Sequence, residues 1–101
     1  MSTHAEYDKE LAAILQALGD NVRELREAKD VSQEEAAERA RLHRTAWGKI
    51  ETGKREPRFS TMLIIANTLG VTLDQLADGI DPPIHRKPPP ANKKSAKPAR
   101  R

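Results

Sequence analysis

The sequence predicts an all-α fold, a compact bundle of five helices followed by a disordered basic tail. Three observations lead to this prediction. Apolar residues recur at intervals of three and four, the spacing of one helix face, and no segment shows the period of two typical of a half-buried strand. Residues that start or end helices divide the first 80 residues into five short stretches. The chain of 101 residues is long enough for one hydrophobic core and too short for two.

The first stretch, residues 8–29, is predicted to form one amphipathic helix or two stacked helices. Its apolar residues are Leu11, Ile14, Leu15, Leu18, Val22 and Leu25. The segment Gly19-Asp20-Asn21 is a weak point at which the helical run could break, because glycine is a poor helix former.

The next two stretches are short helices predicted at 33–40 and 44–51. Ser32 and Glu35 have the spacing of a capping box, in which each side chain satisfies a backbone N–H at the start of a helix. Arg41-Leu42-His43 is a three-residue break between the two helices.

The last two predicted helices begin at cap residues and end at glycines. Thr52-Gly53-Lys54 ends the third helix, and Glu56-Pro57 prevents it from continuing. Ser60 is predicted to cap a fourth helix that closes at Gly70, and Thr72 to cap a fifth that closes at Gly79.

Composition excludes several classes of function. Without cysteine the chain has no disulfide, thiolate zinc site or thiol catalysis, which fits a reducing compartment. It has neither an apolar run long enough to span a membrane nor a signal-peptide core, so we expect a soluble cytoplasmic protein without a membrane partner. The three histidines are too scattered for a metal site, and no nucleotide-binding or hydrolase motif is present. We therefore expect no enzymatic activity, no cofactor and no metal.

Charge is distributed unevenly along the chain. Residues 39–58 carry a net charge of +5, between residues 1–38 with −6 and residues 59–80 with −2. A basic stretch between acidic ones is typical of a surface that binds a polyanion. Residues 81–101 carry a net charge of +6 and six of the seven prolines, with too little apolar surface to fold, so this tail is predicted to be disordered.

The basic stretch coincides with a helix-turn-helix pattern. Two short helices joined by a three-residue turn need a small residue where they cross, which Ala37 provides. Trp47 and Ile50 supply apolar anchors in the second helix, and Leu42 supplies the apolar residue of the turn.

The strings LGDNVRELREAKDVSQEEAAERA and HRTAWGKIETGKREPRFSTMLIIANTLGVTLDQL carry a more specific signal. Between Leu18 and Leu76 the sequence resembles the lambda-repressor-like, Cro-type helix-turn-helix family, also called the xenobiotic-response-element family. The resemblance covers about 60 of the 101 residues. It implies a five-helix bundle, at 11–80, whose third helix enters the DNA major groove, usually in a symmetric dimer. Residues 1–10 are then an N-terminal arm and 81–101 the tail.

The resemblance also implies which residues contact double-stranded DNA. The residues expected to contact bases are Arg44, Thr45, Gly48 and Lys49. An arginine can form two hydrogen bonds with guanine, and a threonine can contact a thymine methyl group or a phosphate. The residues expected to contact phosphates are Gln33, His43, Thr52, Lys54, Arg55 and Arg58. Arg58 could instead enter the minor groove.

Trp47 lies where the family places a buried aliphatic residue, so we expect it in the core rather than stacked on bases. Glu51 is interpreted as a structural partner of a basic residue. The chain departs from the family pattern at three positions. Arg41 replaces the usual turn glycine and must accept a left-handed backbone, His43 replaces the usual Ser or Thr cap, and Gly48 weakens the recognition helix.

These features predict a homodimeric, sequence-specific transcriptional regulator, with double-stranded DNA as its partner and no evident small-molecule effector. A controller of a restriction–modification system, an antitoxin-type regulator and a protein-interaction adaptor that has lost DNA binding are the alternatives. We expect the dimer to form through the last helix, with Leu73, Leu76, Ala77 and Ile80, or through Leu11, Ile14 and Leu15. The tail is expected to attract phosphates without reading sequence, or only to aid solubility.

Overall fold

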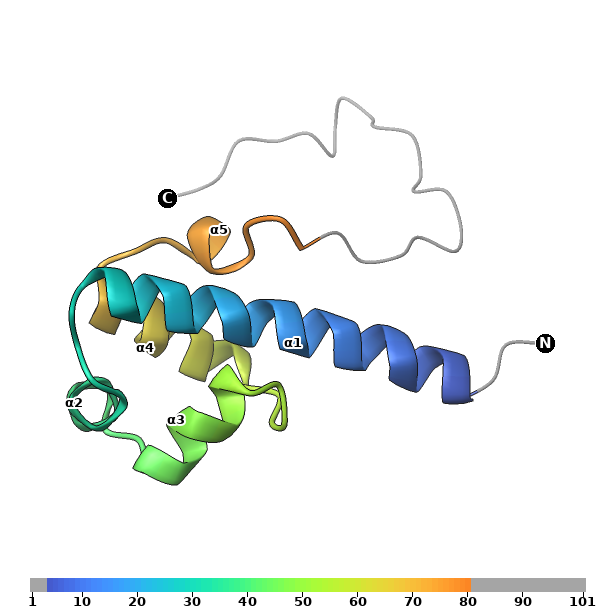
Figure 1. Ribbon diagram of the computed structural model, residues 1–101, viewed down its shortest axis with the longest axis horizontal. Coiled ribbons are helices and arrows are strands. Elements are labelled where there is room, and N and C mark those ends of the chain that lie inside the picture. The colour runs from blue at the N-terminus through green and yellow to red at the C-terminus, as the bar shows by residue number, and fades with distance from the viewer. Residues whose placement is uncertain (1–3, 81–101) are drawn as a thin grey trace, which may run out of the picture.

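The computed structural model describes the backbone of residues 4–80 and the side chains of residues 8–80. The helices of this part are α1 (His4–Ala28), α2 (Gln33–Ala40), α3 (Arg44–Glu51), α4 (Phe59–Leu69) and α5 (Leu73–Leu76). Residues 4–80 contain five helices and no strand, which confirms the predicted all-α fold (Figure 1). The predicted tail, 81–101, lies outside the described residues.

Helix α1 is one continuous helix, so the alternative of two stacked helices is wrong. It begins at His4 rather than at residue 8, and it therefore includes residues 4–10, which we assigned to an N-terminal arm. Figure 1 shows its N-terminal half extending beyond the rest of the bundle. Gly19 does not break the helix. It lies against the end of α3, where a Cβ atom would overlap the backbone oxygens of Ile50 and Glu51.

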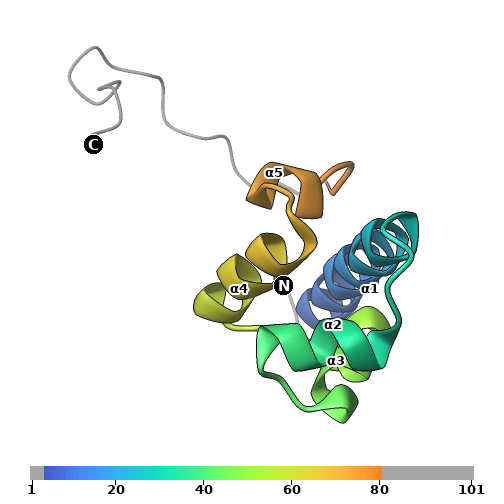
Figure 2. The ribbon, with the colours of Figure 1, turned by 90° about the vertical axis from the view of Figure 1, so that its left-hand side faces the viewer.

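The turn between α2 and α3 has the predicted left-handed residue. Arg41 has φ 59° and ψ 39°, and the backbone N–H of Leu42 donates to the carbonyl of Ala37 at 2.9 Å. Leu42 is half-buried and packs against the core, as predicted for the apolar residue of the turn. Figure 2 shows α2 and α3 joined by this short turn.

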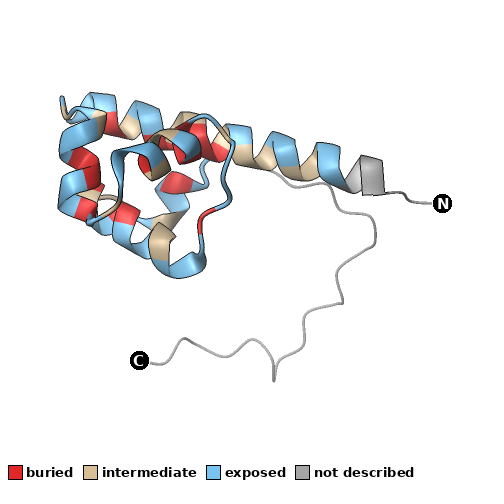
Figure 3. Ribbon diagram, turned by 90° about the horizontal axis from the view of Figure 1, so that it is seen from below, coloured by how far each residue is buried: buried red, intermediate tan, exposed pale blue. Residues whose placement is uncertain are grey.

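The hydrophobic core lies where α1, α2, α3, α4 and α5 meet (Figure 3). Trp47 and Leu76 have no exposed surface, and Ala37 is 1% exposed at the crossing of the helices. The core position predicted for Trp47 is therefore confirmed. The other buried apolar residues are Leu18, Val22, Ala36, Ala40, Ile50, Ile65, Ala66 and Leu69.

The helix caps differ in part from the sequence predictions. Ser32 accepts a hydrogen bond from the backbone N–H of Glu35 at 3.0 Å, but the Glu35 carboxylate pairs with Arg39 rather than completing the capping box. Thr72 does form a complete capping box, with Gln75. Helix α4 begins at Phe59 after the N-cap Arg58, so the prediction that Ser60 caps it is wrong. It ends at Leu69 with Gly70 as its C-cap, as predicted, but α5 ends at Leu76 with the C-cap Ala77, so the prediction that it closes at Gly79 is wrong.

Two helical glycines provide a matched test of the crossing between α1 and α3. Gly19→Ala should destabilise the protein by about 1–3 kcal/mol, because overpacking outweighs the gain in helix propensity. Gly48→Ala should stabilise it by about 0.5–1 kcal/mol, because an added Cβ meets only the Oε1 atom of Gln33, at 3.9 Å. Urea unfolding measures both changes. Equal effects of the two substitutions would contradict the close crossing.

Candidate nucleic-acid interface

Helix α3 has two distinct faces. Trp47, Ile50 and Glu51 point into the protein and are at most 3% exposed. On the other face Arg44, Thr45 and Lys49 are exposed, and Gly48 is half-buried. The structure therefore places all four residues predicted to contact bases on the outer face of one helix.

The loop between α3 and α4 carries the exposed basic residues Lys54, Arg55 and Arg58. Pro57 is buried and anchors this loop to the protein. Gly53 has φ 75°, a left-handed conformation, and an added Cβ would lie 3.0 Å from the Cα atom of Gln16 on α1. The loop therefore turns sharply against α1 and presents its charged side chains to solvent.

Thr52 is exposed, but both of its donors bond within the protein. Its hydroxyl group donates to the carbonyl oxygens of Gly48 at 3.0 Å and Lys49 at 3.3 Å. Its backbone N–H donates to the carbonyl of Gly48 at 3.0 Å. In this conformation Thr52 caps the end of α3 and has no donor directed to a phosphate.

A buried network holds α3 against the first two helices. The guanidinium group of Arg26 on α1 donates two hydrogen bonds to the Glu51 carboxylate, from Nε to Oε2 at 2.6 Å and from a terminal nitrogen to Oε1 at 3.1 Å. The indole N–H of Trp47 donates to Oε2 at 2.6 Å, and the side-chain amide of Gln33 on α2 donates to Oε1 at 2.7 Å. Glu51 is only 1% exposed. Its predicted structural role with a basic residue is confirmed, and the partner is Arg26.

These contacts determine the charge of the network. Burial raises the pKa of the Glu51 carboxyl, but the hydrogen bonds from Arg26, Gln33 and Trp47 outweigh burial and hold that pKa below its ordinary value of 4.5. The hydrogen bond to Glu51 raises the pKa of Arg26, against a smaller opposing effect of burial. The network is therefore an ion pair at neutral pH.

Sequence reasoning missed Arg26 and assigned Gln33 to a phosphate alone. A signal for Arg26 was present, because it follows Leu18 and Val22 at successive intervals of four on the core face of α1. Gln33 uses one of its two amide hydrogens for Glu51. Its side chain therefore connects α2 to α3 whatever else it contacts.

His43 and Gly48, two of the three departures from the family pattern, differ in their surroundings. His43 is the N-cap of α3, is exposed, and forms no side-chain capping bond, as its sequence predicted. Gly48 is not required by packing, because the space beside it is almost open. The fold of the protein alone does not explain a glycine in the middle of α3.

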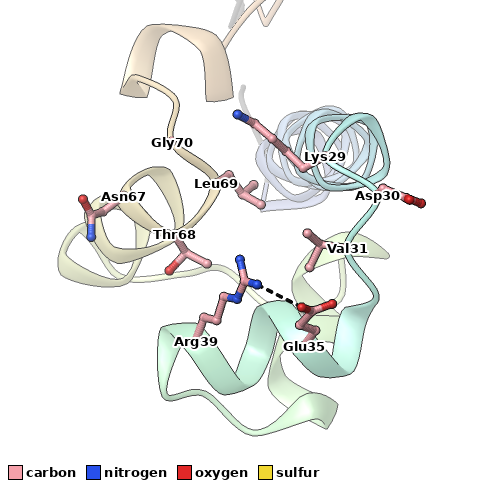
Figure 4. A pocket seen from close by; sticks show the side chains of 9 residues that line it. All are labelled: Lys29, Asp30, Val31, Glu35, Arg39, Asn67, Thr68, Leu69 and Gly70. Atoms are coloured by element: carbon pink, nitrogen blue, oxygen red, sulfur yellow. Dashed lines mark hydrogen bonds and ion pairs between the residues drawn. The ribbon is translucent and has the colours of Figure 1, made fainter.

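Not every basic residue of the 39–58 segment belongs to this face. Arg39 lines a polar hollow of about 500 Å³ between the end of α1, α2 and the end of α4 (Figure 4). There its guanidinium group pairs with Glu35 at 2.9 Å. Glu34 and Glu38 are exposed on α2 and line a second hollow with Arg41, His43 and Arg44. The basic face of α3 thus has an acidic border along α2.

Within residues 4–80, no helix combines the length and apolarity needed to cross a membrane. Among residues 8–80, whose side chains the structure describes, no group of three or more His, Asp or Glu side chains is placed to hold a metal ion.

Two short helices joined by a tight turn, the second with one buried face and one exposed basic face, are typical of a helix-turn-helix DNA-binding protein. Comparison with known proteins supports this class. A family model described as a helix-turn-helix domain matches residues 17–78, and the chain belongs to this family. It is a lambda-repressor-like helix-turn-helix transcriptional regulator.

Three relatives show the extent of the similarity. The chain is 38% identical over 63 residues to the control protein C.SmaI of Serratia marcescens, covering 62% of this chain and 75% of that protein. It is 35% identical over 60 residues to the uncharacterized HTH-type regulator YqaE of Bacillus subtilis, spanning 59% of this chain and 52% of that protein. The crystal structure of the restriction–modification controller protein C.AhdI from Aeromonas hydrophila matches with a TM-score of 0.62 and 36% identity, over 63% of this chain and 97% of that one.

The buried network predicts a specific dependence of stability on Glu51. At pH 7, Glu51→Gln should lower the free energy of unfolding by about 3–5 kcal/mol, because it leaves the buried Arg26 charge without its counterion. A carboxyl whose pKa is lower in the folded state stabilises the protein above its unfolded pKa, and this contribution is lost as pH falls through the folded value. The difference between the variant and the original protein should therefore shrink as pH falls below about 4.5.

Urea unfolding between pH 3 and pH 7 measures this difference. Glu35→Gln is the control, because it removes only an exposed pair with Arg39, worth about 0.3–0.5 kcal/mol. A Glu51→Gln protein as stable as the Glu35→Gln protein at pH 7 would show that the network does not hold the fold.

Proposed function

We propose that the protein binds a pseudo-palindromic operator as a homodimer, with α3 of each copy in the major groove. The division of α3 into a fully buried face and a charged outer face carries this proposal. Because the Glu51 network fixes α3 against α1 and α2, the outer side chains keep one orientation before DNA is bound. Such preorganisation lowers the entropy lost on binding.

Base reading is assigned to the outer face of α3. Its eight residues span about 12 Å, the length of three to four base pairs. Arg44, in the first turn, is proposed to form two hydrogen bonds with guanine, and Lys49 follows Thr45 by one turn on the same side. The open space beside Gly48 lets DNA approach the helix backbone between them.

Phosphate contacts are assigned to residues on both sides of α3. His43 precedes the helix, and the loop after it supplies Lys54, Arg55 and Arg58. Gln33 has a second amide hydrogen available for a phosphate at the N-terminus of α2, where backbone N–H groups also point outward. These contacts set the register of the protein on DNA without reading sequence.

Two substitutions separate base reading from phosphate binding. Arg44→Ala should weaken binding to the preferred site by about 1–3 kcal/mol and relax the preference at one base pair per half-site. Lys54→Ala should weaken binding to all sequences alike and reduce the salt dependence of binding. Selection from a random DNA pool identifies the preferred site, and titration at several salt concentrations measures both effects. Equal loss on all sequences in Arg44→Ala would contradict its assignment.

The dimer is assigned to α4 rather than to the segments expected from sequence. Leu76 lies in the core of its own subunit and has no exposed surface, so it is not available as a contact. Leu73 and Ile80 pack against the same core. The large exposed apolar residues are instead on α4, with Phe59 66%, Leu63 45% and Ile64 44% exposed. Several large exposed apolar residues on one helix favour an interface, and a second copy would cover them with the same residues.

Substitutions on α4 and α5 distinguish the two possible interfaces. The double variant Phe59→Gln with Leu63→Gln should weaken dimerisation at least tenfold, because each substitution acts twice in a symmetric interface. Ala77→Gln, on the exposed surface of α5, should leave the dimer unchanged. Sedimentation equilibrium of the free protein and of its DNA complex measures both. A dimer lost in Ala77→Gln alone would move the interface to α5.

A narrower function is that of a controller of a restriction–modification system. Two of the relatives, C.SmaI and C.AhdI, are named as control or controller proteins, and the chain covers 75% and 97% of them. This role requires an operator beside restriction or methyltransferase genes. Locating the selected binding site in the genome decides the question. A site beside unrelated genes would leave a general regulator.

A further inference from the structure

An apolar groove lies between the N-terminal half of α1 and the end of the described chain. Its volume is about 310 Å³. Its apolar lining comes from Ala13, Ile14 and Ala17 of α1 and from Ile80, and Lys9 and Glu10 also line it. The groove is separate from the outer face of α3, because α5 and α3 lie on opposite sides of α1 in Figures 1 and 2.

The bundle does not cover this part of α1. From residue 8 to residue 17 no side chain is buried, whereas Leu18, Val22 and Arg26 farther along the helix are. Figure 3 shows the same change along α1. Leu11, Ile14 and Leu15 nevertheless continue the apolar stripe of the helix. The helix therefore offers an apolar surface with no described segment over it beyond Ile80.

We propose that the groove binds the first part of the protein's own C-terminal tail, residues 81–87, with Ile84 as the apolar anchor. The described chain ends at Ile80, which itself lines the groove, and 21 residues follow it. Prolines aside, Ile84 is the only apolar residue of that segment larger than alanine. The four residues from Ile80 to Ile84 reach about 13 Å when extended, and residues 9–17 of α1 span about 12 Å, so Ile84 reaches every part of the groove.

The local sequence favours this contact. Pro82 and Pro83 restrict the backbone to extended conformations, which lowers the entropy lost when the segment docks. Arg86 and Lys87 follow Ile84 after the single residue His85, and residues 4–10 of α1 contain three acidic residues against one lysine. The apolar anchor and the charges therefore complement the same end of α1.

Docking of residues 81–87 limits which basic residues of the tail can reach DNA. It holds Arg86 and Lys87 on the side of α1 away from α3, so they make no phosphate contact. The basic residues that remain free to reach DNA are Lys93, Lys94, Lys97, Arg100 and Arg101.

Paramagnetic broadening in the full-length chain tests the proposal. The chain has no cysteine, so Ala91→Cys provides a single site for a nitroxide label. The label should broaden the backbone amides of residues 9–17 more strongly than those of residues 20–28, although residues 20–28 carry a net charge of −1 and residues 9–17 carry none. Ile84→Ser should reduce the broadening at 9–17 at least twofold, while Ala96→Ser should leave it unchanged.

A second pair of variants tests the groove itself. Ala12 and Ala13 are both exposed on α1, but only Ala13 lines the groove. Ala13→Arg should abolish the selective broadening, and Ala12→Arg, which adds the same charge, should preserve it. Equal effects of the two, or broadening spread evenly along α1, would overturn the proposal in favour of simple charge attraction. Broadening seen only in mixtures of spin-labelled and isotope-labelled copies would overturn it in favour of a second copy.

Discussion

The Glu51 carboxylate is the contact on which the geometry of the domain depends. It is buried and accepts hydrogen bonds from Arg26 on α1, Gln33 on α2 and Trp47 on its own helix. A buried charge is costly unless it is paired and fully hydrogen-bonded, so one arrangement of these helices is strongly favoured. Rotating α3 by one residue would separate Glu51 from these partners. The network therefore fixes which residues of α3 face outward.

Close packing complements this polar contact. Gly19 lets α1 approach the end of α3 until their backbones touch, and small residues on α2 do the same for its neighbours. Gly48 serves no such purpose, because nothing crowds it within the subunit. The fold explains Gly19. The proposed approach of DNA to the outer face of α3 explains Gly48.

The surface divides into regions with different physical character. The outer face of α3 and the loop after it are basic and suited to DNA. The exposed part of α4 carries three large apolar side chains and is the proposed contact with a second copy, while the N-terminal half of α1 combines an apolar groove with acidic residues. These regions lie on different elements, so a partner bound at one of them does not occupy the surface of another.

The sequence by itself determined the all-α class, the bounds of α2 and α3, the left-handed turn at Arg41 and the inner and outer faces of α3. The class, the helix bounds and the faces of α3 depend on local periodicity and caps, which a single segment contains, and the family resemblance implied the turn at Arg41. Only the tertiary structure decided that α1 is continuous through Gly19, that Arg26 pairs with Glu51 and that Leu76 is buried while Phe59 is exposed. Each depends on how helices far apart in sequence are placed against one another. An amphipathic pattern shows that a face is apolar, but it does not show which neighbour covers that face.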